Sequence, residues 1–84
     1  MTSAGASQRY TLYGTAACHL CELAEALLQA ECRANARIAF EKVDISVSED
    51  LFQRYGVRIP VLQDPAGREL GWPFSAAELR AFVG

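Results

Sequence analysis

The sequence has no long apolar run, little net charge and few of the residues that usually bind metals. No stretch approaches the roughly 18 consecutive apolar residues that a membrane-spanning helix needs, so we expect no membrane association. The eight Lys and Arg residues are scattered, and the net charge is −2, which gives no electrostatic basis for nucleic-acid binding. A single histidine and three cysteines leave few ligands for a metal held within one chain.

The amino-terminal segment also lacks a targeting signal. Residues 1–8 are small and polar, without the basic cluster and apolar stretch of a secretory signal, and they offer almost nothing to bury. We therefore expect a flexible tail over residues 1–8. An odd number of cysteines argues against a framework of structural disulfides. Because the sequence shows no export signal, we expect a cytoplasmic protein. Paired cysteines in that reducing compartment are usually catalytic or metal-binding.

The chain has enough apolar material for one small domain. It contains 84 residues, and 51% of them are hydrophobic, which favours a folded core over disorder. A chain of this size buries only a little over ~60% of its extended surface, so its margin of stability is narrow. We expect a single domain over residues 9–84 that works as a monomer.

Periodicity and turn residues predict alternating strands and helices. The predicted elements are a strand over 9–14, a helix over 18–34, a strand over 38–45, a helix over 46–55, a β-type run over 57–63, a strand over 68–70 and a last helix ending at Phe82. The first two strands flank a helical crossover and should be parallel, and the turn at 64–67 should close an antiparallel hairpin. The predicted order β-α-β-α-β-β-α gives an α/β fold with a four-stranded mixed sheet and helices on both faces.

Local sequence signals predict where two of the helices begin and which face of the first helix is buried. Ser48 is a plausible cap for the second helix, and Ser75 with Glu78 forms a capping box before the last one. In the first helix, the apolar positions that should face the core are Leu20, Leu23, Ala24, Leu27 and Leu28.

Cys18 and Cys21 lie at the junction between the first predicted strand and the first predicted helix. Two cysteines at this spacing can close a small disulfide ring or hold one metal. The first cysteine meets the unpaired N–H groups and the positive dipole end of the helix. That setting favours a thiolate, which is the reactive species. The pair is therefore predicted to be a catalytic dithiol.

Other interpretations of the cysteines stay open. A mononuclear zinc site needs about four ligands, and the chain offers only Cys18, His19, Cys21 and the distant Cys32. We therefore predict no metal within one chain. A cluster shared between two chains remains an alternative, and so does a protein-interaction module with inert cysteines.

Several neighbouring residues also have two interpretations. Cys32 is expected in the core rather than in exchange chemistry. His19 is either a solvated residue or an imidazole that lowers the Cys18 pKa. Trp72 and Phe74 either cap the core or form an apolar wall for a protein substrate.

The order of these elements resembles the thioredoxin superfamily, and the count of four strands and three helices resembles its glutaredoxin branch. The resemblance rests on the Cys-His-Leu-Cys motif at a helix start and on Ile59-Pro60 at the start of a later strand. It covers residues 9–82 and looks like a short bacterial type with an atypical motif. It implies a thioredoxin-like fold.

The resemblance also implies residue roles. Cys18 matches the nucleophile of the family and Cys21 the resolving cysteine. Pro60 matches a proline that the family holds in a cis peptide bond beside the dithiol, although only about 5–6% of X–Pro bonds are cis. Ile59 matches the residue whose backbone pairs with an extended substrate or with the cysteine of glutathione, as a short β-like edge.

The sequence departs from the family pattern in three places. His19 replaces the usual proline or glycine, and the lysine often found shortly before the motif is absent. The Gly-Gly and acidic pair that binds glutathione is replaced by residues 71–75. The Ser75 hydroxyl with nearby N–H groups is the nearest substitute for that pair, and Arg58 or Arg54 for the lysine.

The sequence therefore predicts a glutaredoxin-like thiol–disulfide oxidoreductase with a role in cell redox homeostasis. Its partners would be protein or low-molecular-weight disulfides, with glutathione as a candidate co-substrate and no resident cofactor. The alternative is a non-enzymatic thioredoxin-fold module that binds an iron–sulfur cluster or a protein partner.

Overall fold

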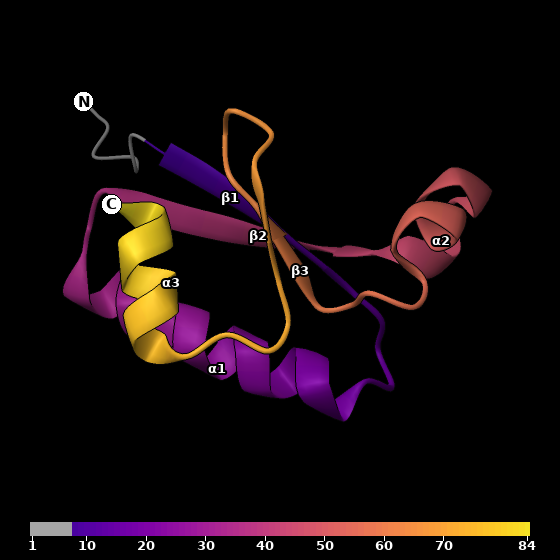
Figure 1. Cartoon of the computed structure of the whole chain (residues 1–84), viewed down its shortest axis with the longest axis horizontal. Helices are drawn as coiled ribbons and strands as arrows, with labels where there is room; N and C mark the ends of the chain where they lie inside the picture. The colour runs from indigo at the N-terminus through magenta and orange to yellow at the C-terminus, as the bar shows by residue number, and fades with distance from the viewer. Residues whose placement is uncertain (1–7) are drawn as a thin grey trace.

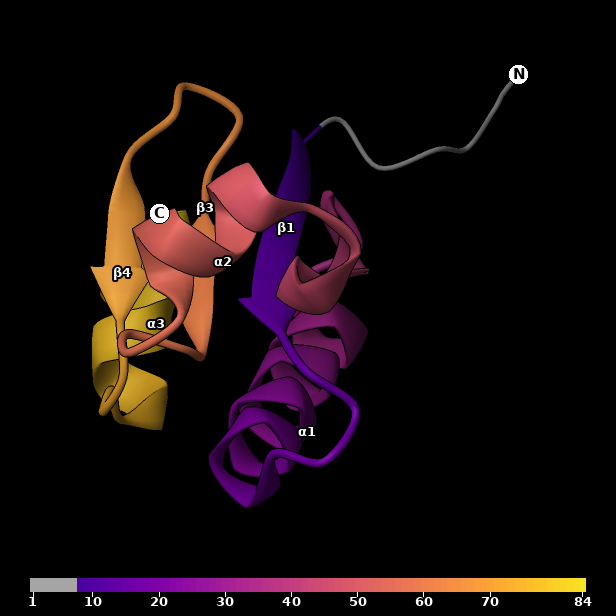
Figure 2. The ribbon, with the colours of Figure 1, turned by 90° about the vertical axis from the view of Figure 1, so that its right-hand side faces the viewer.

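The computed structural model describes residues 8–84, and its strands form one four-stranded mixed sheet (Figures 1 and 2). The elements are β1 (Gln8–Gly14), α1 (His19–Ala34), β2 (Ile38–Asp44), a 3₁₀ turn (Ile45–Val47), α2 (Glu49–Tyr55), β3 (Val61–Gln63), β4 (Glu69–Gly71) and α3 (Ala76–Val83). The strand order is β2-β1-β3-β4. β1 is parallel to β2 and antiparallel to β3, which is antiparallel to β4. This confirms the predicted α/β class and element order.

The two faces of the sheet carry separate cores. Leu12 and Leu62, paired across β1 and β3, belong to the main core, which includes Ala24 and Leu28 of α1 and Leu79 of α3. The adjacent pair on the same two strands, Tyr13 and Val61, belongs to a second core on the opposite face. Successive side chains of a strand point to opposite faces, so α1 and α3 cover one face and α2 the other. Figure 1 shows α1 and α3 together, with α2 apart from them.

The second core is small and lies near the carboxyl end of β1. Ile45, Tyr55 and Val61 are fully buried in it, and Tyr13 and Ile59 pack against them. The 3₁₀ turn and α2 therefore attach to the sheet close to the end from which the chain enters α1.

The β-type run predicted over 57–63 is a strand only over its last three residues. The N–H groups of Arg58 and Ile59 donate to the Tyr55 carbonyl at 2.8 and 3.0 Å, which continues the turn after α2. Pro60 has no N–H to donate to a neighbouring strand. The strand therefore begins at Val61, after the proline.

Other boundaries move by a few residues. Gln8, expected in the tail, is the first residue of β1 and pairs with Ile38, while residues 1–7 of the expected tail lie outside the described part. α2 begins at Glu49 rather than at 46, with Ser48 as its predicted cap. Ile45, expected in a strand, begins the 3₁₀ turn instead. Gly67 has φ +94° in the predicted 64–67 turn, where a side chain would be strained.

The predicted buried face of α1 is wrong at its first two positions. Leu20 and Leu23 are 46% and 43% exposed, and the buried positions are Cys21, Ala24 and Leu28. Leu20 and Leu23 each directly precede a buried position, so they lie about 100° around the helix from the buried stripe. The apolar spacing predicts the helix but not which side of its broad apolar stripe is buried. No helix among residues 8–84 combines the length and apolarity needed to span a bilayer.

Candidate functional site

Cys18 and Cys21 are joined by a disulfide at the amino-terminal end of α1. Cys18 is the N-cap, with extended backbone, and its Sγ accepts a hydrogen bond from the Cys21 N–H at 3.0 Å. Cys18 is half-buried, whereas Cys21 is only 8% exposed. The more accessible cysteine is therefore the one that occupies the helix cap.

Gly14, the last residue of β1, makes room for the buried cysteine. A Cβ atom at this position would lie 2.8 Å from Cys21 Sγ and 3.2 Å from Cys21 Cβ. Real side chains do not tolerate the shorter of these distances, so the close approach of strand and sulfur requires glycine.

His19 points along the solvent side of the helix. Its Nδ1 lies 3.7 Å from Glu22 Oε1, and both side chains are at least 70% exposed. An exposed pair of this kind contributes little to stability. The predicted influence of His19 on Cys18 stays a prediction.

The Ile59–Pro60 peptide bond is cis, as the resemblance implied. Pro60 is fully buried, and its carbonyl accepts from the Trp72 N–H at 3.1 Å. Because Val61 pairs with Tyr13, the start of β3 lies at the carboxyl end of β1, the same end that leads into the dithiol. The topology therefore brings the Ile59–Pro60 segment to the same end of the sheet as Cys18.

The backbone of Ile59 is partly engaged within the chain. Its N–H donates to the Tyr55 carbonyl, whereas within residues 8–84 its own carbonyl accepts no hydrogen bond. The carbonyl is thus the group at this position that can meet an incoming N–H without breaking a bond in the protein.

The Trp72–Pro73 bond is also cis, which the sequence analysis missed. Phe74 is buried in the main core, as one of the two interpretations expected, and Trp72 packs on it edge to face at 5.0 Å between ring centroids. Trp72 itself is half-buried, so its outer surface remains accessible.

Ser75 caps α3 through the predicted capping box. Its Oγ accepts from the Glu78 N–H at 3.0 Å, and the Glu78 carboxylate accepts from the Ser75 N–H at 2.8 Å. Ser75 is exposed, and its hydroxyl still has a proton to donate. Its predicted contact with glutathione stays a prediction.

Arg58 is bound by a residue that the sequence analysis did not single out. Arg58 Nη2 donates to Glu69 Oε1 at 2.8 Å, and the other oxygen of Glu69 accepts from the Tyr55 hydroxyl at 2.6 Å. The hydrogen bond from Tyr55, followed by that from Arg58, lowers the Glu69 pKa. No local pattern could have found Glu69, because its partners lie 11 and 14 residues earlier in the chain.

This carboxylate makes stability depend on pH. The Glu69 pKa is lower in the folded protein than its ordinary value of about 4.3, so its stabilisation is complete above that value and is lost as the pH falls through the folded pKa. We expect urea unfolding to show a steeper loss of stability below about pH 4.5 in the wild type than in Glu69→Gln. Equal acid slopes for the two proteins would contradict this expectation.

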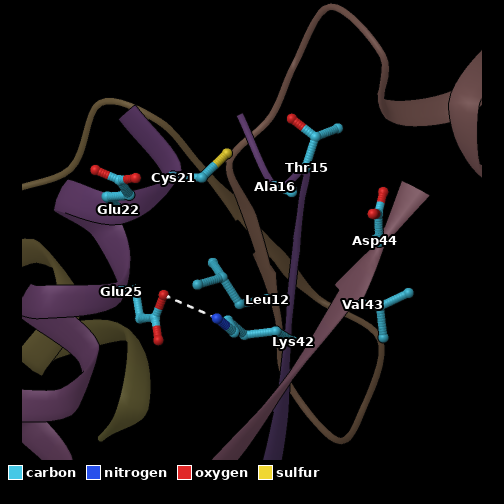
Figure 3. Close-up of a pocket in the computed structure, with 10 residues that line it drawn as sticks. Leu12, Thr15, Ala16, Cys21, Glu22, Glu25, Lys42, Val43 and Asp44 are labelled. Atoms are coloured by element: carbon cyan, nitrogen blue, oxygen red, sulfur yellow. Dashed lines mark hydrogen bonds and ion pairs between the residues drawn. The ribbon is translucent and has the colours of Figure 1, made fainter. Parts of the chain in front are cut away.

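A pocket of about 430 Å³ lies beside the dithiol, between α1 and the carboxyl ends of β1 and β2 (Figure 3). Its lining consists of Leu12, Gly14, Thr15, Ala16, Cys21, Glu22, Glu25, Lys42, Val43 and Asp44. Lys42 of β2 donates to Glu25 of α1 at 3.3 Å (Figure 3). Cys21 forms part of the wall of this pocket, although only 8% of its surface is exposed.

Within residues 8–84, no three side chains of the metal-binding types His, Cys, Asp and Glu lie close enough to hold an ion. The third cysteine, Cys32, is half-buried and packs against the main core, as expected. Burial, with the nearby Glu31 charge, raises the pKa of its thiol. A thiol with a raised pKa is a poor nucleophile at neutral pH.

The comparisons with known proteins agree with the glutaredoxin-like resemblance and with the thioredoxin-like fold. The family described as Glutaredoxin-like domain (DUF836) matches residues 9–84. No curated protein matches the chain. The solved structure of target protein XcR50 from X. campestris is 49% identical, with 88% of this chain and 93% of that chain covered and a TM-score of 0.77.

Two further structures show how far the likeness extends. Protein Ne2328 from Nitrosomonas europaea is 26% identical, with 98% of both chains covered and a TM-score of 0.77. The oxidised thioredoxin from Plasmodium falciparum is 12% identical, with 93% of this chain and 79% of that chain covered and a TM-score of 0.67. At that identity the second match shows a shared thioredoxin-like fold only.

Proposed function

Because the chain belongs to the glutaredoxin-like domain family, we propose that it is a thiol–disulfide oxidoreductase that uses the Cys18–Cys21 pair. The observation that carries the proposal is the position of Cys18 as N-cap of α1, with its Sγ 3.0 Å from the Cys21 N–H and Cys21 itself buried one turn behind. A negative charge on Cys18 would gain from that N–H and from the helix dipole.

The proposed exchange has two steps. The Cys18 thiolate attacks one sulfur of a substrate disulfide, forming a mixed disulfide and releasing the other substrate sulfur as a thiolate. The Cys21 thiolate then attacks the Cys18 sulfur, which closes the 18–21 bond and releases the second substrate thiolate. Two electrons pass from the protein to the substrate, and an external thiol must return them.

The same site suggests how a substrate would lie. An extended segment next to the reacting disulfide could donate an N–H to the Ile59 carbonyl. Ser75 and the N–H groups at the start of α3 are proposed contacts for the carboxylate of a glutathione moiety. We propose glutathione as the returning thiol, protein and small disulfides as substrates, and action as a monomer in the cytoplasm.

The test is equilibration of the protein with defined mixtures of reduced and oxidised glutathione. Thiol trapping and mass spectrometry then report the state of each cysteine. We expect a reversible 18–21 disulfide whose occupancy follows the glutathione ratio, with Cys32 reduced throughout. Cys18 and Cys21 that stay reduced in every mixture would contradict the proposed function.

A further inference from the structure

One carboxylate connects the three segments around the Ile59–Pro60 bond. Glu69 of β4 accepts from the Tyr55 hydroxyl, at the end of α2, and from the guanidinium of Arg58, in the following turn, at 2.6 and 2.8 Å. The Glu69 side chain is 26% exposed; its bond with Tyr55 is partly buried, whereas its bond with Arg58 is exposed to water. Hydrogen bonds with a charged partner are stronger than neutral ones.

Tyr55 connects Glu69 to the backbone of Ile59, the proposed docking residue. Its side chain is fully buried and stacks on Tyr13, with ring centroids 4.4 Å apart. Its carbonyl accepts the N–H groups of both Arg58 and Ile59. The residue that Glu69 binds through its hydroxyl is thus the residue that holds the Ile59 N–H.

Arg58 contacts both Tyr55 and Glu69. Its guanidinium lies 5.4 Å from the centre of the Tyr55 ring while it donates to Glu69. Both ends of the turn after α2 are therefore attached to the same carboxylate on the neighbouring strand. The turn leads directly into the Ile59–Pro60 bond.

We propose that Glu69 is a positioning residue that holds the Ile59 backbone in place for substrate docking, through Tyr55 and Arg58. The inference rests on the proposed thiol–disulfide exchange. Glu69 belongs to β4, at the edge of the sheet, and its two bonds go to the turn rather than to the dithiol. Its loss should weaken docking of a disulfide and leave the reactivity of Cys18 unchanged.

The variant Glu69→Gln tests this. Glutamine keeps the size of the side chain, but it replaces one of the two accepting oxygens by an NH2 group, which is itself a donor. In single-turnover reduction of oxidised glutathione by the reduced protein, we expect the half-saturating concentration to rise about fivefold to tenfold, with little change in the limiting rate. Alkylation of Cys18 by iodoacetamide, which needs no docking edge, should keep its wild-type rate. Tyr55→Phe, which keeps the bond between Arg58 and Glu69, should give a smaller rise.

The matched control is Glu41→Gln, the same change at an exposed position on β2, the opposite edge strand from β4. Hydrogen exchange of the Ile59 amide gives a second measurement that does not depend on activity, and we expect faster exchange in Glu69→Gln only. Unchanged exchange of that amide would overturn the inference. A wild-type protein that fails to reduce any disulfide would instead overturn the proposed function, and the amide measurement would still decide the role of Glu69.

Discussion

Replacing Cys18 by serine is expected to reduce disulfide exchange to the uncatalysed background. A serine hydroxyl at the helix cap could still accept the Cys21 N–H, so the start of α1 should stay intact. The attacking thiolate would nevertheless be gone, and Cys21, only 8% exposed, is poorly placed to replace it. The measurement is the initial rate of reduction of a small aromatic disulfide whose thiol product absorbs light.

Replacing Cys21 by serine should have a different result. Cys18 can still attack, but no second thiol can release the substrate, so one substrate moiety should remain bound to Cys18. Mass spectrometry without a reducing agent would show this adduct at stoichiometric amounts. The adduct should be absent from Cys18→Ser.

The matched control for both variants is Cys32→Ser. Cys32 packs against the main core and has a raised pKa, so we expect exchange at the wild-type rate in that variant. A Cys18→Ser protein that still reduced the test disulfide faster than background would show that the proposed two-step exchange is wrong.

The parts of the fold that the sequence predicted are those with local signals. The Cys-x-x-Cys motif follows a strand and opens a helix, Ser48 and Ser75 cap their helices, and Gly67 occupies a turn with positive φ. Each of these depends on residues within four positions of one another, so the chain alone determines them.

The parts that the sequence missed depend on contacts between distant segments. The exposure of Leu20 and Leu23 follows from which side of α1 packs on the rest of the domain, and the apolar spacing of the helix does not determine that side. The bonds of Glu69 to Tyr55 and Arg58 join β4 to the end of α2 and the next turn. The cis bond at Pro60 was predictable only from the family resemblance, and the one at Pro73 was missed.

The contact with the largest expected effect on the exchange reaction is the one between Gly14, at the end of β1, and Cys21, in α1. Replacing Gly14 by alanine places a methyl group 2.8 Å from the Cys21 sulfur, so the sulfur or the strand must shift. Misplacement of a reacting atom by about 1 Å can cost about a hundredfold in rate. We therefore expect closure of the 18–21 bond to slow by about that factor, while alkylation of Cys18 is unaffected.

The slow step should appear as a long-lived mixed disulfide. In rapid-quench experiments with oxidised glutathione, Gly14→Ala should accumulate the Cys18 adduct that the wild type resolves quickly. The matched control is Gly71→Ala, because an added Cβ there meets no atom within 4 Å, and its adduct should decay at the wild-type rate. A Gly14→Ala protein that folds and resolves the adduct as fast as the wild type would mean that Cys21 can move without loss, so its buried position would be a matter of packing rather than of chemistry.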